Sequence, residues 1–156
     1  MSGIIITSQK KLVAHHKDEH EPYEYYKYEV TPRRDFSQAY ICFYEIPPQK
    51  YNYPIHYHDF NTEAFYIISG EGLLITEDDT SPIKAGDIVV CPSGKEGGHQ
   101  LFNSSSTQLL TYIDFDTIHS PDVVHYPHSQ KIGIIQHNVS SQFYKEEDQA
   151  DYYEGE

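Results

Sequence analysis

Short apolar and aromatic runs separated by turn residues dominate the middle of this chain. The first long run is Ala39–Ile46, closed by Pro47 and Pro48, and the run Ala64–Ile68 ends at a Ser-Gly-Glu-Gly turn. Runs of this length that are rich in aromatic and β-branched residues predict strands, and proline and glycine between them predict turns. The pattern therefore predicts an all-β antiparallel sandwich or small barrel.

The arrangement of the strands follows from the same pattern. Ala64–Ile68 and Leu73–Thr76 flank one tight turn, so we expect them to form a hairpin. The unbroken apolar runs predict strands that are buried on both faces, and the tyrosine-rich run Tyr23–Tyr28 predicts an edge strand. Further predicted strands are Tyr53–His58, Ile88–Cys91, His99–Asn103, Gln108–Phe115 and Lys131–Ile135.

Three regions follow from this pattern within a single domain. We expect residues 1–35 to form a polar N-terminal arm with an edge strand, and residues 36–118 to form the barrel core. Residues 119–156 would be a C-terminal extension that packs on the barrel and ends in an acidic tail. A chain of 156 residues is long enough to close one hydrophobic core without disulfides or a structural metal.

The charge balance limits the partners. The chain has 24 Asp and Glu against 11 Lys and Arg, a formal net charge of −13, and its only arginines are Arg33 and Arg34. Binding to phosphate groups needs a surplus of basic residues. We therefore expect that the chain binds neither nucleic acid nor an anionic membrane surface. No apolar run approaches the roughly 20 residues that span a bilayer, and the N-terminus lacks the pattern of a signal peptide. Two cysteines without a C-x-x-C motif predict free thiols and a cytoplasmic location.

Ten histidines are unusual in so acidic a chain, and some of them have an informative spacing. Alternation along a strand puts His56 and His58 on one face, and after a turn Glu63 can face back toward them. His99, which opens a later strand, can supply a fourth donor. Three imidazoles and one carboxylate suit one divalent transition metal, Fe, Mn, Ni, Cu or Zn, better than Ca or Mg.

Each of these residues taken singly has a simpler interpretation. Surface histidine pairs are common, a lone glutamate is usually solvated, and a lone histidine is usually a hydrogen-bonded structural group. The other seven histidines lie in the arm or after the barrel, where we expect surface positions, one of which could rim a pocket. Asp114 and Asp116 end a predicted strand and are expected to face solvent. The joint spacing of the four candidate donors is what favours a metal site.

That spacing resembles the first motif of the cupin family. The family motif is H-x-H, a short gap, a glutamate, six residues and a glycine, and the chain has His56 and His58, four residues, Glu63, six residues and Gly70. The resemblance implies a cupin barrel, also called a double-stranded β-helix or jelly roll, with the metal inside one mouth. It also implies a homodimer.

The second cupin motif is present in a looser form. It is a glycine, five residues, P-x-G, a gap, a histidine, three residues and an asparagine, matched here by Gly86, Pro92, Gly94, His99 and Asn103. The gap before His99 is four residues where two are usual. The resemblance implies that His99 completes the ligand set with His56, His58 and Glu63, and that Asn103 is a structural side chain.

The C-terminal segment resembles a narrower group within the family. The segment that begins Pro121-Asp122-Val123-Val124 and the aromatic, acidic and glycine-containing end are similar to small single-domain bacterial cupins, some of which are labelled sugar phosphate isomerases. Such a label passes between relatives by analogy, and a shared fold does not establish a shared reaction.

Two classes of function remain open. One is a metal-dependent enzyme that acts on a small polar organic or sugar-like substrate, as an isomerase or epimerase or as an oxygenase. Lys95 and Glu96, in the loop before His99, are the charged residues best placed to act at the metal mouth. The other class is a non-catalytic module that binds or senses a small molecule. The charge of −13 repels a phosphate, so a neutral ligand is expected in either case.

Overall fold

The computed structural model describes residues 4–31 and 38–156. These residues form thirteen β-strands and four short 3-10 helices, and no α-helix occurs among them. The prediction of an all-β fold is therefore confirmed. Arg33, Arg34 and the predicted boundary between residues 35 and 36 lie outside the described residues. Within the described ranges no helix is long and apolar enough to cross a membrane.

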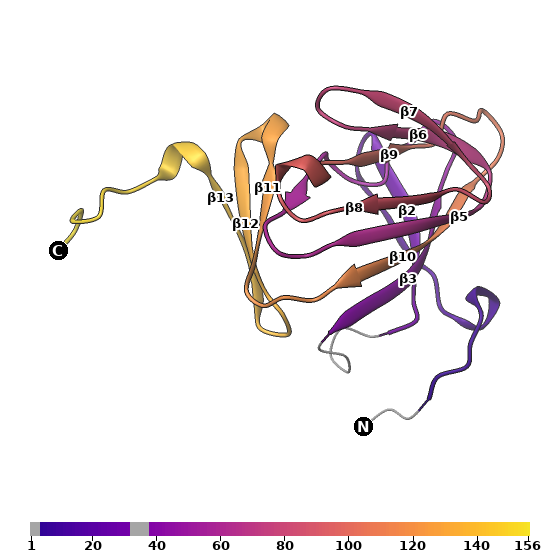
Figure 1. Ribbon diagram of the computed structural model, residues 1–156, viewed down its shortest axis with the longest axis horizontal. Coiled ribbons are helices and arrows are strands. Elements are labelled where there is room, and N and C mark those ends of the chain that lie inside the picture. The colour runs from indigo at the N-terminus through magenta and orange to yellow at the C-terminus, as the bar shows by residue number, and fades with distance from the viewer. Residues whose placement is uncertain (1–3, 32–37) are drawn as a thin grey trace.

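Two sheets face each other and enclose the core (Figure 1). The six-stranded sheet has the order β1 (His15–His20), β2 (Tyr23–Glu29), β3 (Ala39–Ile46), β10 (Leu110–Thr117), β5 (Glu63–Ser69) and β8 (Ile88–Cys91). The three-stranded sheet has the order β7 (Thr80–Lys84), β6 (Glu71–Ile75) and β9 (Gln100–Phe102). The edge strands of the six-stranded sheet are β1 and β8, and β2 lies between β1 and β3, so the prediction that residues 23–28 form an edge strand is wrong.

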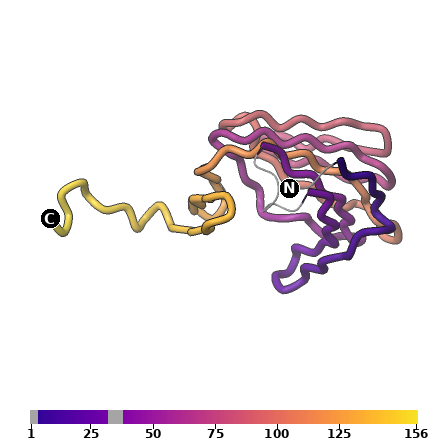
Figure 2. Tube along the Cα trace, turned by 90° about the horizontal axis from the view of Figure 1, so that it is seen from below, coloured from indigo at the N-terminus to yellow at the C-terminus, as the bar shows by residue number. Residues whose placement is uncertain are grey.

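A third sheet stands at one end of the barrel. Its order is β13 (Ser140–Lys145), β12 (Lys131–Gln136), β11 (Asp122–Tyr126) and β4 (Tyr57–His58). Figure 1 shows β11, β12 and β13 side by side at this end, and Figure 2 shows the chain leaving the barrel after them. Of these three strands the sequence predicted only β12. The last eleven residues, 146–156, are all exposed, as expected for an acidic tail.

Alternation along the strands builds the core. On β3 every second side chain is buried, namely Tyr40, Cys42, Tyr44 and Ile46. These pack against inward residues of the neighbouring strands and of the facing sheet, because successive side chains of a strand point to opposite faces. The prediction of burial on both faces is wrong for β5 and β8, where the outward side chains of Tyr66, Ile88 and Val90 are exposed.

The predicted hairpin between residues 64–68 and 73–76 is also wrong. β5 pairs with β10 and β8, whereas β6 pairs with β7 and β9, so the turn between them carries the chain from one sheet to the other. Gly70 makes this turn with φ +85°, and a Cβ there would lie 2.4 Å from the carbonyl oxygen of Leu109. Only glycine fits this close approach without strain.

Candidate metal centre

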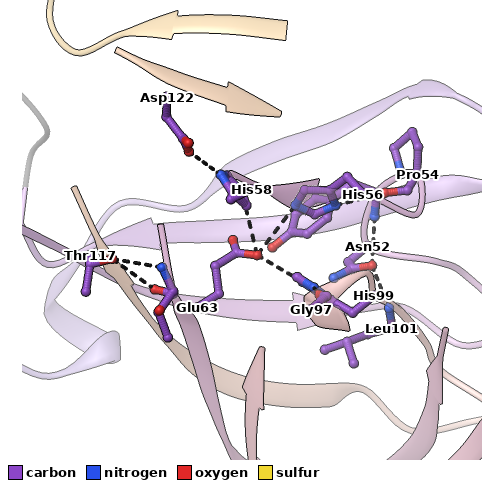
Figure 3. A network of polar contacts seen from close by, with 12 residues as sticks. Asn52, Pro54, His56, His58, Glu63, Gly97, His99, Leu101, Thr117 and Asp122 are labelled. Carbon is purple, nitrogen blue, oxygen red and sulfur yellow. Dashed lines mark hydrogen bonds and ion pairs between the residues drawn. The ribbon is translucent and has the colours of Figure 1, made fainter. Parts of the chain in front are cut away.

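Four side chains converge at the end of the barrel beside the third sheet. Glu63 Oε2 lies 3.5 Å from His56 Nε2, 3.6 Å from His58 Nε2 and 3.0 Å from His99 Nε2. Figure 3 shows the Glu63 carboxylate between the three imidazoles. The sequence predicted these four residues as one cluster, and the structure brings all four together.

Backbone pairing explains how residues so far apart in the chain meet. The main chains of His56 and His99 form a two-way bridge, in which the N–H of His56 donates over 3.2 Å and the N–H of His99 over 3.0 Å. The longer gap before His99 contains the short helix η2 (Lys95–Gly97). A Cβ on Gly97 would lie 1.7 Å from the Pro92 carbonyl oxygen, so glycine is needed for this loop to close against the barrel.

Two of the histidines are oriented by main-chain carbonyl groups. His56 Nδ1 lies 3.0 Å from the carbonyl oxygen of Pro54, and His99 Nδ1 lies 2.8 Å from that of Gly97. A carbonyl oxygen can only accept a hydrogen bond, so each Nδ1 carries the proton. The Nε2 atom of each ring is then the one directed at the glutamate, which is the usual orientation of a metal-binding histidine.

The third histidine is oriented by a carboxylate from β11. His58 Nδ1 hydrogen-bonds to Asp122 Oδ2, and Asp122 Oδ1 accepts a 3.1 Å bond from the N–H of Phe60. Only 1% of Asp122 is exposed. Burial alone would lower the pKa of His58, but the hydrogen bond to Asp122 and the charge of Glu63 outweigh it and raise that pKa above its usual value.

The donor atoms at the centre fit a metal ion. Burial favours the neutral form of Glu63, yet His99 and His56 beside it hold the pKa of its carboxyl well below the usual range. Glu63 Oε2 and His99 Nε2 are buried and form no hydrogen bond of good geometry, although they lie 3.0 Å apart. The ligand atoms of His56, His58 and Glu63 lie within 4.8 Å of one another. Three imidazole nitrogens that converge on one carboxylate oxygen are a donor set that a divalent transition metal binds.

A cavity of about 430 Å³ opens beside this cluster. His56, His58 and Glu63 belong to its lining. Aromatic side chains of the barrel, Tyr25, Tyr40, Tyr44 and Tyr53, line one part, and Val124, Tyr126, Ile135 and Phe143 of the third sheet line another. The C-terminal strands therefore form a wall of the cavity as well as orienting a histidine.

Two acidic side chains of β10 also line the cavity, which corrects the expectation that they face solvent. Asp114 is only 1% exposed, and Asp116 is half-buried. Because β10 pairs with β3 on one side and β5 on the other, the face that carries Tyr112 also turns Asp114 and Asp116 inward. Burial, and then the neighbouring charges of Asp116 and Glu63, raise the pKa of Asp114 well above its usual value.

Lys95 and Glu96 lie apart from this cavity. Both are exposed in η2, and Lys95 Nζ lies 3.4 Å from Glu77 Oε2. Neither belongs to the cavity lining, which carries the acidic residues of β10 instead. A catalytic role for Lys95 or Glu96 stays a prediction from the sequence.

Asp122 is a site residue that the motif spacing does not predict. The signal that marks it is the alternation of Asp122, Val124 and Tyr126, all three of which line the cavity. The prolines and histidines around this run hide its alternation in the sequence. His119, which is exposed as expected, and His137, which is half-buried, lie at the rim and also belong to the cavity lining.

Comparison with known proteins identifies the family. The family model described as "Cupin domain" matches residues 42–115, which include all four converging side chains and all of the second motif. Residues 42–115 of the chain form a cupin domain. The solved structures that are similar to this chain have barrels of the double-stranded β-helix type, as the chain itself does.

Two solved structures share this cupin fold over most of the chain. One, from Acidithiobacillus ferrooxidans, is called "Putative sugar phosphate isomerase" and has a TM-score of 0.81 at 24% identity, covering 94% of this chain and 95% of that one. The other is called a sugar phosphate isomerase from a cupin superfamily, comes from Silicibacter pomeroyi and has a TM-score of 0.72 at 18% identity. The match covers 80% of this chain and 78% of the Silicibacter pomeroyi chain. At these identities the likeness shows the fold.

A curated relative matches only in part. The cupin is 34% identical over 65 residues to the "Oxalate-binding protein" of Thermotoga maritima. The match covers 42% of this chain and spans about half, 51%, of the length of that relative.

Proposed function

We propose that this cupin binds one divalent transition metal through His56, His58, Glu63 and His99. We further propose that it is a metal-dependent enzyme acting on a small polar organic or sugar-like molecule. The observation that carries the proposal is the convergence of three imidazole Nε2 atoms on one buried carboxylate oxygen. The donor set suits Fe, Mn, Ni, Cu or Zn.

The residues around the metal position have distinct tasks in this proposal. A bound metal supplies a Lewis acid that polarises an oxygen of the ligand. Asp122 holds His58 in the orientation that presents Nε2. Val124, Tyr126 and Phe143 cover the cavity and exclude water, and the tyrosines of the barrel offer hydroxyl groups to a polar ligand.

An isomerase or epimerase is supported better than an oxygenase. Both isomerisation and epimerisation move a proton beside a carbonyl group, which needs an acid or base in the cavity as well as a metal. Asp114 and Asp116 place carboxyl groups in the cavity next to Glu63. The names of the two structural neighbours agree with this reaction class but establish only the fold.

The charges that line the cavity favour a neutral ligand over a phosphorylated one. Among the described lining residues Lys27 is the only lysine or arginine, and its Nζ already lies 2.9 Å from Glu29 Oε1. Four lining residues are acidic: Glu63, Asp114, Asp116 and Asp122. A phosphate needs cationic anchors, so we propose a neutral sugar or a small polar organic molecule as the ligand.

One experiment tests the metal, the reaction and the ligand together. Protein purified without chelators is analysed for metals, then loaded and assayed with aldose and ketose pairs, free and phosphorylated, and for oxygen uptake with diketones. We expect about one histidine-bound transition metal per chain and turnover of a free sugar. Failure to contain or take up metal would overturn the metal centre. Calorimetric binding without any turnover would favour the alternative, a non-catalytic module that binds or senses a small molecule.

We also propose that the protein is a cytoplasmic homodimer. The outward face of β5, β8 and β10 carries exposed apolar side chains, including Tyr66, Ile88, Val90 and Phe115. A contiguous apolar face of this kind marks an interaction site, and a second copy would bury it. Light scattering that finds a monomer at every concentration would contradict the dimer.

A further inference from the structure

Three carboxyl groups form a second cluster inside the cavity. The ligand atoms of Glu63, Asp114 and Asp116 lie within 4.8 Å of one another. Asp116 is paired in register with Glu63 across β10 and β5, and Asp114 lies two residues earlier on the same face of β10. Two rigid, paired strands therefore hold all three groups in place.

One oxygen of this cluster lacks a hydrogen-bond partner within the described residues. Asp114 is 1% exposed, and its Oδ1 is buried without a hydrogen-bond partner in the part of the chain that the structure describes. A buried ionised carboxylate is strongly unfavourable unless a cation or a donor compensates it. Lys27, the lysine nearest in the lining, lies over the Tyr40 ring and pairs with Glu29.

The number of acidic side chains that line the cavity also favours a bound cation. Glu63, Asp114, Asp116 and Asp122 carry four negative charges when ionised. One divalent ion at the histidines balances two of these charges, and a second divalent ion would balance the other two. Carboxylate oxygens without imidazoles suit hard cations such as Mg²⁺, Mn²⁺ and Ca²⁺.

We propose that Glu63, Asp114 and Asp116 form a second site for a hard divalent cation, next to the histidine site. Glu63 belongs to both clusters and bridges the two sites, and in this respect the inference rests on the proposed function. The hydroxyl or carbonyl oxygens of a ligand with two neighbouring oxygens, such as a vicinal diol or a hydroxycarbonyl, match two cations held side by side.

The test counts bound cations in the full-length protein. Metal-free protein receives one equivalent of Co²⁺, whose visible spectrum reports imidazole ligation, and is then dialysed against Mn²⁺ and analysed for both metals. We expect one Co²⁺ and one Mn²⁺ per chain. The double variant D114N D116N keeps the Co²⁺ spectrum and loses the Mn²⁺, while the matched control D59N, with its substitution outside the cavity lining, keeps both.

A second measurement does not depend on stoichiometry. Mg²⁺ binds imidazole poorly, so it raises the Tm of the Co²⁺-loaded wild type but leaves that of the double variant unchanged. Co²⁺ binding without Mn²⁺ or a Mg²⁺ shift would overturn the second site and leave the histidine site standing. Mn²⁺ binding without imidazole-ligated Co²⁺ would overturn the histidine site alone. No binding of either ion would overturn both.

Discussion

His58 on β4 and Asp122 on β11 are hydrogen-bonded to each other although they lie 64 residues apart in the chain. The buried carboxylate accepts from Nδ1, which leaves Nε2 directed at Glu63. The C-terminal sheet therefore does more than cover the barrel. It fixes the tautomer and the ring orientation of a histidine that belongs to the cupin motif.

Replacing Asp122 with asparagine should weaken metal binding. The amide has nearly the shape of the carboxylate but lacks its charge, so it holds the His58 Nδ1–H less strongly. We expect metal affinity to fall about 10- to 100-fold while the fold is retained. Competition with a chromophoric chelator measures the change. D59N, with its carboxylate outside the cavity lining, is the matched control, and equal affinities for D122N and wild type would contradict the role of Asp122.

The histidines of the chain should differ sharply in their contribution to metal binding. Replacing His56 and His58 with alanine removes two converging donors, so we expect loss of the histidine-bound metal. Replacing His15 and His16, which are exposed on β1, should leave it bound. Elemental analysis of the two double variants, prepared identically, makes the comparison. If both lost metal equally, the arm rather than the barrel would be implicated.

Asn103 should be a stability residue, not a ligand. Its buried Nδ2 donates to the carbonyl oxygens of Ile46 over 2.7 Å and of Gln108 over 2.8 Å. Alanine at this position leaves two buried acceptors without a donor, which costs about 1–3 kcal/mol in the free energy of unfolding. Urea denaturation measures the loss. The control is Thr107→Ala, at an exposed position of the same loop, and should change stability little.

Two glycines separate the effect of backbone conformation from that of close contact. Gly70 and Gly86 both have positive φ, but only at Gly70 would a Cβ meet another atom, the carbonyl oxygen of Leu109. We expect Gly86→Ala to cost about 1–2 kcal/mol from the left-handed conformation alone. Gly70→Ala should cost more, since Leu109 or the turn must also move. Equal losses in thermal or urea unfolding would show that the close approach is relieved without strain.

The thiol of Cys42 should be unreactive in the folded protein. Burial raises the pKa of Cys42 to about 11, so at pH 8 the side chain is the neutral thiol and not the nucleophilic thiolate. Mass spectrometry after iodoacetamide treatment at pH 8 should find no label on either buried cysteine. In urea both should react. Labelling of Cys42 in the folded state would contradict its burial.

The spacing of a few residues was enough to predict which side chains meet. Alternation along one strand places His56 beside His58, and a turn returns Glu63 toward them, so local rules suffice. His99 is a candidate because it opens a later strand, and the resemblance to the second cupin motif supports it; the four residues before it include the short helix η2. The convergence is a property of the structure, and metal binding by these residues stays a proposal.

The remaining parts of the site depend on pairing between distant strands. Nothing near Asp122 in the sequence shows that β11 lies beside β4. Asp114 was expected to face solvent because acidic residues are rarely buried, and its position between β3 and β5 overrides that tendency. The hairpin prediction failed for a related reason, since neighbours in sequence were assigned to one sheet when the turn at Gly70 divides them between two.

The position of Asp122 late in the chain has a consequence for the order of assembly. A chain folds as it is synthesised from its N-terminus, so the motif residues from His56 to His99 are complete before β11 and the wall strands exist. Until then His58 has no carboxylate to orient it, and the cavity lacks the wall formed by β11 to β13. We therefore expect a metal ion to be held firmly at the proposed site only after residues 122–145 have been made and the last sheet has docked.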